Sequence, residues 1–129
     1  MDAPQVTLFD SFTNDIVNSV RGILCDYNFG SQHHRYFTRF HQHKRIVETY
    51  YKLEKFIKMA PALRTKADIF INVSDTAWKT LIDLHTPMCT GKTVEEDFMH
   101  KMDSEIRGMC QCLDDLVVTI CGRHANFYL

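Results

Sequence analysis

The stretch TVEEDFMHKMDSEIRGMCQCLDDLVVTIC, Thr93–Cys121, decides the fold, because its large apolar residues recur every three or four positions. This spacing places them on one face of a helix and leaves the polar residues for solvent. Thr93 and Glu96 have the form of an N-terminal capping box, and Gly122 is suited to end the helix. The stretch therefore predicts a long surface helix over 93–121, followed by a tail over 122–129. Its apolar positions are Phe98, Met102, Ile106, Met109, Leu113, Leu116, Val117 and Ile120.

The same periodicity, followed outward from this stretch, predicts three more helices over 6–27, 31–59 and 62–86. Ser31 is a candidate N-cap, while Pro61 and Pro87 follow the second and third helices. The third helix is the least regular, because Ile69–Val73 is rich in residues that favour strands. A helix throughout is the prediction, and a break near Ser74 stays open.

Four amphipathic helices joined by short connections predict an all-α fold, a single up-down-up-down four-helix bundle over residues 1–129. Five glycines and three prolines are too few for the many turns of a β-sandwich or barrel. No apolar run approaches the ~20 residues of a membrane-spanning helix, so no membrane insertion is expected.

The charges are distributed unevenly although the formal net charge is only −1. Residues 1–30 carry one Arg and four Asp, residues 31–66 carry nine Lys or Arg and two Glu, and residues 67–129 carry five bases and ten acids. This pattern predicts either a basic helix that packs between acidic neighbours or a basic binding surface.

The cysteine pattern indicates free thiols, since the chain has five cysteines and three of them fall in one predicted helix. The N-terminal residues lack the basic and apolar regions of a secretory signal. Both observations predict a reducing compartment and an intracellular protein, either cytoplasmic or nuclear.

The sequence contains no motif that identifies a reaction, so no catalytic residue, cofactor or metal is predicted and a non-enzymatic protein is expected. Cys110 and Cys112 do not form a CxxC pair. His43 differs from the other histidines because it lies within the apolar stripe of the second helix, together with Glu54, while His85 lies on the stripe of the third. These three residues support one alternative hypothesis, a small enzyme or ligand carrier with a site in the bundle core.

The second helix has apolar residues over roughly half its circumference, at about 100° per residue. A helix of this kind is covered on two sides, either within its own bundle or at a subunit interface. The leading hypothesis is therefore a protein interaction or adaptor module that binds a protein partner or self-associates as a homodimer. The predicted interface residues are Phe37, Ile46, Tyr51 and Leu53.

A basic stripe flanks the apolar face of the same helix, and Arg35 and Arg39 lie on the opposite flank. Such a stripe suits contacts with phosphates or with an acidic partner. Nucleic-acid binding is therefore the other alternative hypothesis, although helix-turn-helix and zinc-finger signatures are absent. The stripe consists of His34, His41, Arg45, Lys52 and Lys55.

Overall fold

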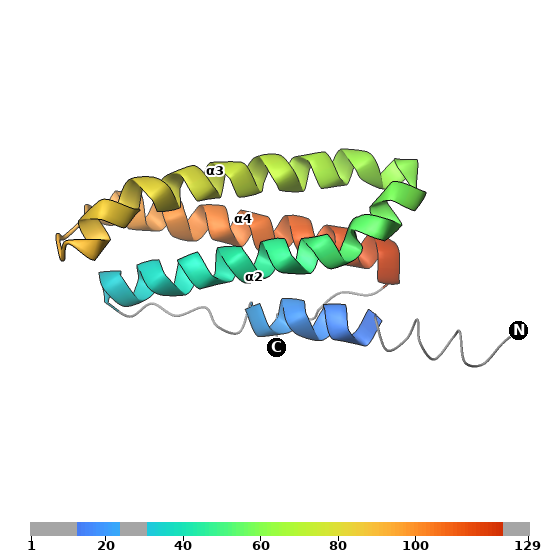
Figure 1. Ribbon diagram of the computed structural model, residues 1–129, viewed down its shortest axis with the longest axis horizontal. Helices are drawn as coiled ribbons and strands as arrows, with labels where there is room; N and C mark the ends of the chain where they lie inside the picture. Colours follow the sequence, from blue (N-terminus) through green and yellow to red (C-terminus); the bar gives the residue numbers. More distant parts are fainter. Residues whose placement is uncertain (1–12, 24–30, 123–129) are drawn as a thin grey trace, which may run out of the picture.

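The computed structural model describes residues 13–23 and 31–122, which form helices packed side by side (Figure 1). The helix of residues 13–23, α2 (Gln32–Met59), α3 (Arg64–Cys89) and α4 (Glu96–Cys121) alternate in direction along the chain. A 3-10 turn, Pro61–Leu63, connects α2 to α3. The predicted all-α, up-down-up-down bundle is confirmed. None of the described helices is long and apolar enough to cross a membrane.

The ends of α2 and α4 follow the signals in the sequence. The Ser31 hydroxyl accepts a hydrogen bond from the His34 amide at 3.3 Å, as an N-cap does, and α2 ends two residues before Pro61. Gly122 ends α4 in the left-handed region, with φ of 77°. Between these two helices, α3 runs through Ser74 without a break and continues past the predicted end at residue 86 to Cys89, so that Pro87 lies inside its last turn and does not follow it. Gly91, with φ of 74°, terminates this helix in the left-handed region.

The predicted capping box at the start of α4 is wrong. The N-cap is Glu95, whose side chain makes no capping hydrogen bond. The Glu96 carboxylate binds the Arg35 guanidinium of α2 instead of a backbone amide. The Gln32 side chain holds the preceding loop, since its amide donates to the Val94 carbonyl at 2.7 Å and its oxygen accepts from the Val94 amide at 3.0 Å.

All four helices contribute to one apolar core. Ile46 and Leu53 of α2 are 0 % exposed, and they pack with apolar residues of the other three helices. α3 and α4 contribute rows at helical spacing, as the periodicity predicts. The core residues outside α2 include Ile16, Val20, Phe70, Leu81, Met99, Ile106, Leu113 and Val117.

A buried ionic cluster joins α2 to α4. The Arg39 Nε donates to Asp103 Oδ1 at 2.8 Å, and Arg35 Nη2 donates to Asp103 Oδ2 at 2.7 Å. Arg39, 0 % exposed, also donates to Gln42, whose amide reaches the Ile23 carbonyl at 3.0 Å. This chain of hydrogen bonds therefore links α4, α2 and the helix of residues 13–23. The predicted packing of a basic helix against acidic neighbours is confirmed for Arg35 and Arg39.

Removing the charge of Asp103 is expected to destabilise the fold, because two buried guanidinium groups lose the carboxylate that they share. We expect Asp103→Asn to lower the free energy of unfolding by about 3–5 kcal/mol, measured by urea denaturation. Asp115→Asn, on the same helix, is the control, since the Lys66–Asp115 pair is exposed and worth at most about 1 kcal/mol. Equal, small losses for both variants would contradict a structural role for the cluster.

Candidate functional site on the α2–α3 face

Apolar side chains collect on the surface where α2 and α3 lie side by side. Tyr51 is 61 % exposed, and Ile71, Trp78 and Ile82 are 41 %, 42 % and 50 % exposed. Steps of three or four residues place each set on one side of its helix, at about 100° per residue. We call this surface the outer face. It comprises Phe40, Lys44, Val47, Tyr51 and Glu54 of α2 and Ile71, Asp75, Trp78 and Ile82 of α3.

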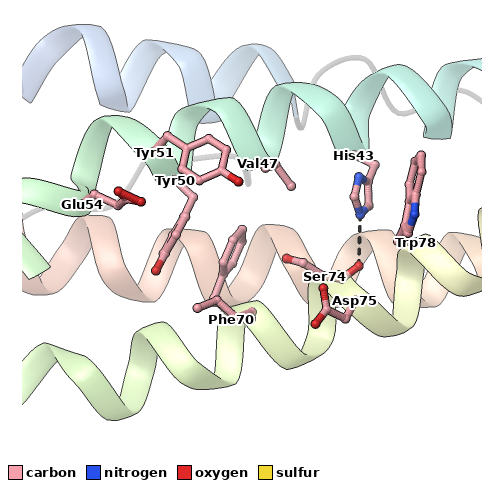
Figure 2. A pocket seen from close by; sticks show the side chains of 10 residues that line it. His43, Val47, Tyr50, Tyr51, Glu54, Phe70, Ser74, Asp75 and Trp78 are labelled. Carbon is pink, nitrogen blue, oxygen red and sulfur yellow. Dashed lines mark hydrogen bonds between the residues drawn. The ribbon is translucent and has the colours of Figure 1, made fainter.

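The outer face is hollowed between the two helices (Figure 2). One hollow has a volume of about 360 Å³, and a second of about 330 Å³ shares His43, Val47 and Trp78 with it. The larger volume falls at the lower end of small-molecule pockets. The two hollows form one open groove along the outer face, which suits a docked side chain or a small apolar ligand.

Aromatic rings from both helices form the walls of this groove. Tyr50 of α2 stacks on Phe70 of α3 with ring centroids 4.6 Å apart. Trp78 lies 5.8 Å from Phe40 and 5.3 Å from the imidazole of His43, centroid to centroid. Contacts of this kind fix the rings, so the groove is a preformed surface.

Two polar groups lie within the apolar walls. The His43 Nε2 and the Ser74 carbonyl are 3.0 Å apart, and burial lowers the pKa of His43 below its usual 6.5. A neutral imidazole protonated on Nε2 therefore donates to this carbonyl. The buried Ser74 hydroxyl has no hydrogen-bond partner among the described residues.

Charged groups line both hollows of the outer face. In Figure 2, Glu54 lies at one end of the larger hollow, whereas Asp75 lies beside Ser74, between Phe70 and Trp78. Lys44 and Glu48 line the smaller hollow. Burial, and then the charges of Glu54 and Asp68, raise the pKa of Tyr50. Both signs of charge are thus presented on one apolar surface.

The four predicted interface residues divide into two pairs. Phe37 and Tyr51 are exposed, Tyr51 on the outer face and Phe37 at its edge. Ile46 and Leu53 are core residues of the bundle, so they are unavailable to a partner. They point about 140–160° away from Tyr51 around the helix axis, towards α4 and the helix of residues 13–23.

The predicted basic stripe lies on another side of α2. His34, His41, Arg45, Lys52 and Lys55 are all exposed and follow the side of the helix turned away from α3. Arg45 reaches the helix of residues 13–23, since a Cβ at Gly22 would lie 3.0 Å from its Nη2. Nucleic-acid binding through the stripe stays a prediction. Arg35 and Arg39, which the sequence placed on the flank opposite the stripe, are instead buried in the ionic cluster.

The proposed trio of His43, Glu54 and His85 does not form one site. His43 and Glu54 line the larger hollow, whereas His85 does not. The Nδ1 of His85 is 2.7 Å from the Tyr36 hydroxyl, and its Nε2 is 3.5 Å from the Cys89 sulfur. The ligand-carrier hypothesis stays a prediction, and the larger hollow, which His43 and Glu54 line without His85, is the cavity available to it. Among the described residues, no group of three His, Cys, Asp or Glu could hold a metal ion.

Trp78, Ile71 and Asp75 are site residues that the sequence analysis did not identify. A signal for them was present, because they recur at steps of three and four along α3. That spacing merges with the core stripe of the same helix, so periodicity alone does not separate the two. The chain matches no protein-family model, no curated protein and no solved structure.

The lowered pKa of His43 predicts that stability depends on pH. Above its ordinary pKa of 6.5 the histidine is neutral in both states. Below it the unfolded chain binds the proton more readily than the folded one, so stability falls as pH decreases. We expect urea unfolding to show this loss as the pH falls below about 6.5. His43→Gln should flatten the slope and the exposed-residue variant His41→Gln should not, and an unchanged slope in His43→Gln would exclude His43 as the responsible group.

The cysteines are expected to differ in reactivity, because the thiolate is the nucleophile. Cys89 is exposed, while burial raises the pKa of Cys110 to about 12 and also raises that of Cys112. Iodoacetamide should alkylate Cys89 at least ~10-fold faster than Cys110 or Cys112, measured by peptide mass spectrometry. In concentrated urea the three rates should converge. Labelling of native Cys110 as fast as Cys89 would contradict the packing of α4.

Proposed function

We propose that this protein is a non-enzymatic interaction module that associates with a second copy of itself through the outer face of α2 and α3. The observation that carries the proposal is the row of exposed aromatic and branched side chains over a preformed groove, led by Tyr51, Trp78 and Ile82. Contiguous exposed apolar patches larger than a few hundred Å² are uncommon on monomeric proteins and are typical of interaction sites.

The surface that α2 and α3 present together is large enough for a dimer. Helices of 26 and 28 residues are about 40 Å long, and two neighbours present a surface about 20 Å wide. This corresponds to about 800 Å² per copy, the usual size of a stable interface, and the outer face occupies about half of that length. The helices of the face are also ordered by their own core, so association would cost little further conformational entropy.

The composition of the face favours a second copy over an unlike partner. An unlike partner with one sign of charge would face a surface that carries both Lys44 and the carboxylates Glu54 and Asp75. A second copy presents the same mixture and can complement it, as isologous interfaces do. The sequence pattern predicts self-association through the second helix alone, and the exposed apolar residues of α3 extend the proposal to that helix.

The test is the oligomeric state of two matched variants of α3. Ile71 is 41 % exposed on the outer face, and Ile69 is 51 % exposed about 200° away around the helix. We expect the natural protein to sediment as a dimer, Ile71→Asp as a monomer with unchanged helix content, and Ile69→Asp as a dimer. Sedimentation velocity at low and high salt gives the answer.

Two results would overturn the proposal. A natural protein that is monomeric at both salt concentrations, at concentrations near 100 μM, would remove self-association (about −5 kcal/mol at that Kd). A dimer that is abolished equally by Ile69→Asp and Ile71→Asp would place the interface elsewhere.

A further inference from the structure

Four charged residues mark the corners of a rectangle on the α2–α3 surface. Lys44 and Glu54 lie ten residues apart on α2, about 15 Å along the helix. Arg64 and Asp75 lie eleven residues apart on α3, about 16 Å. Arg64 precedes Ile71 by seven residues, so it shares the side of α3 that carries the outer face. Among the described residues, no ion pair involves any of the four.

Ring contacts between the helices set which corners are level with each other. Tyr50 stacks on Phe70, and Phe40 contacts Trp78, while the two helices run in opposite directions. Counting from these contacts, Lys44 is level with positions 74–76 of α3, which centre on Asp75. Glu54 is likewise level with positions 64–66, which include Arg64. Opposite charges therefore alternate around the rectangle.

A two-fold axis can bring two such faces together in two ways. With the axis along the bundle, each residue of α2 meets the residue of the partner's α3 at its own level. Lys44 then meets a carboxylate at position 75, and Glu54 meets a guanidinium at position 64. With the axis across the helices, α2 meets the partner's α2 running in the opposite direction. Lys44 then meets a carboxylate at position 54 only when position 49 lies on the axis.

The apolar residues distinguish the two arrangements. They extend beyond the edge of the rectangle that Lys44 and Asp75 mark, from Phe37 to Tyr51 on α2 and from Ile71 to Ile82 on α3. With the axis along the bundle, the apolar region of one copy faces that of the other over its whole length, because residues at the same height along the helices meet. A crossing axis at position 49 places Trp78 opposite the α2–α3 connection of the other copy. A crossing axis at the centre of the apolar region, near position 44, brings the Lys44 side chains of the two copies against each other.

Resting on the proposed function, we propose that the two copies associate about a two-fold axis parallel to their helices, pairing Lys44 with Asp75 of the partner subunit and Glu54 with Arg64 of the partner subunit. In this arrangement α2 and α3 of both copies form an antiparallel four-helix layer around the axis. Phe40 meets the partner's Trp78, and Val47 meets the partner's Ile71. The groove of each copy is filled by side chains of the other.

Charge exchange at Lys44 and Asp75 tests the arrangement. Lys44→Glu and Asp75→Lys each turn two attractions of the dimer into repulsions, so each should raise the dissociation constant at least ~10-fold at low salt. The double variant K44E/D75K restores both pairs and should dimerise like the natural protein. An equimolar mixture of the two single variants should form a heterodimer for the same reason.

The matched control is K44E/E54K, which restores charge pairing only when the axis crosses the helices. We expect this double variant to be as weak as Lys44→Glu alone or weaker, and all variants to keep their helix content because the exchanged groups lie on the surface.

Each other outcome overturns a defined part of the proposal. Rescue by K44E/E54K without rescue by K44E/D75K overturns the parallel axis. Single variants that dimerise like the natural protein overturn the charge pairing, while the Ile71→Asp comparison still decides the proposed function. A monomeric natural protein overturns both.

Discussion

The structure depends on the buried carboxylate of Asp103, which two arginines of α2 clamp from one side of the helix. Taking such charges out of water is costly unless every partner is in place. Arg35 and Arg39 are one turn apart, so both reach Asp103 only when α2 has one rotation and one height relative to α4. A shift of α2 by one turn would leave a buried guanidinium without its carboxylate. The cluster therefore fixes which side of α2 faces the core.

The rotation of α2 determines which of its apolar residues are left outside. The side that carries Ile46 and Leu53 is turned into the bundle, and the side that carries Val47 and Tyr51 is turned towards the outer edge of α3. The hydrogen bond from His43 to the Ser74 carbonyl connects α2 and α3 at the base of the groove. The groove is thus a consequence of two polar contacts, one on each flank of the helix.

The sequence predicted the order of the described helices and the approximate bounds of α2, α3 and α4 because apolar periodicity depends on each helix alone; the predicted ends of the first helix, at 6 and 27, lie outside the described residues. Ser31 and Gly122 were predicted as terminal residues for the same reason, since capping acts within a few residues. Glu96 was misassigned because its carboxylate has two possible partners, a nearby backbone amide or Arg35, sixty-one positions away. Local pattern favours the first, and the packing of α4 against α2 provides the second.

The same limit applies to the candidate site. Periodicity gives the direction of Ile46 or Tyr51 around its own helix, but not which neighbouring helix occupies that direction. The wide apolar surface of the second helix predicted coverage on two sides: α3 and α4 both pack against α2, and a subunit interface stays a prediction. Assigning Ile46 and Leu53 to the core, and Tyr51 to the surface, requires the positions of α3 and α4. Trp78 was missed because its helix offers one continuous stripe in which core and surface positions are adjacent.

The proposed dimer would account for the breadth of the apolar surface of α2. A helix that served only its own bundle would need the side with Ile46 and Leu53, and its other flank would be polar. In the proposed dimer, α2 belongs to two four-helix arrangements, one within the chain and one across the two-fold axis. The ionic cluster orients α2 for the first, and the proposed pairs of Lys44 and Glu54 would fix its position along the helix axis in the second. Because the ionic cluster is buried and the proposed pairs lie on the surface, changes that abolish association should leave the fold intact, so the two roles of the helix would vary separately.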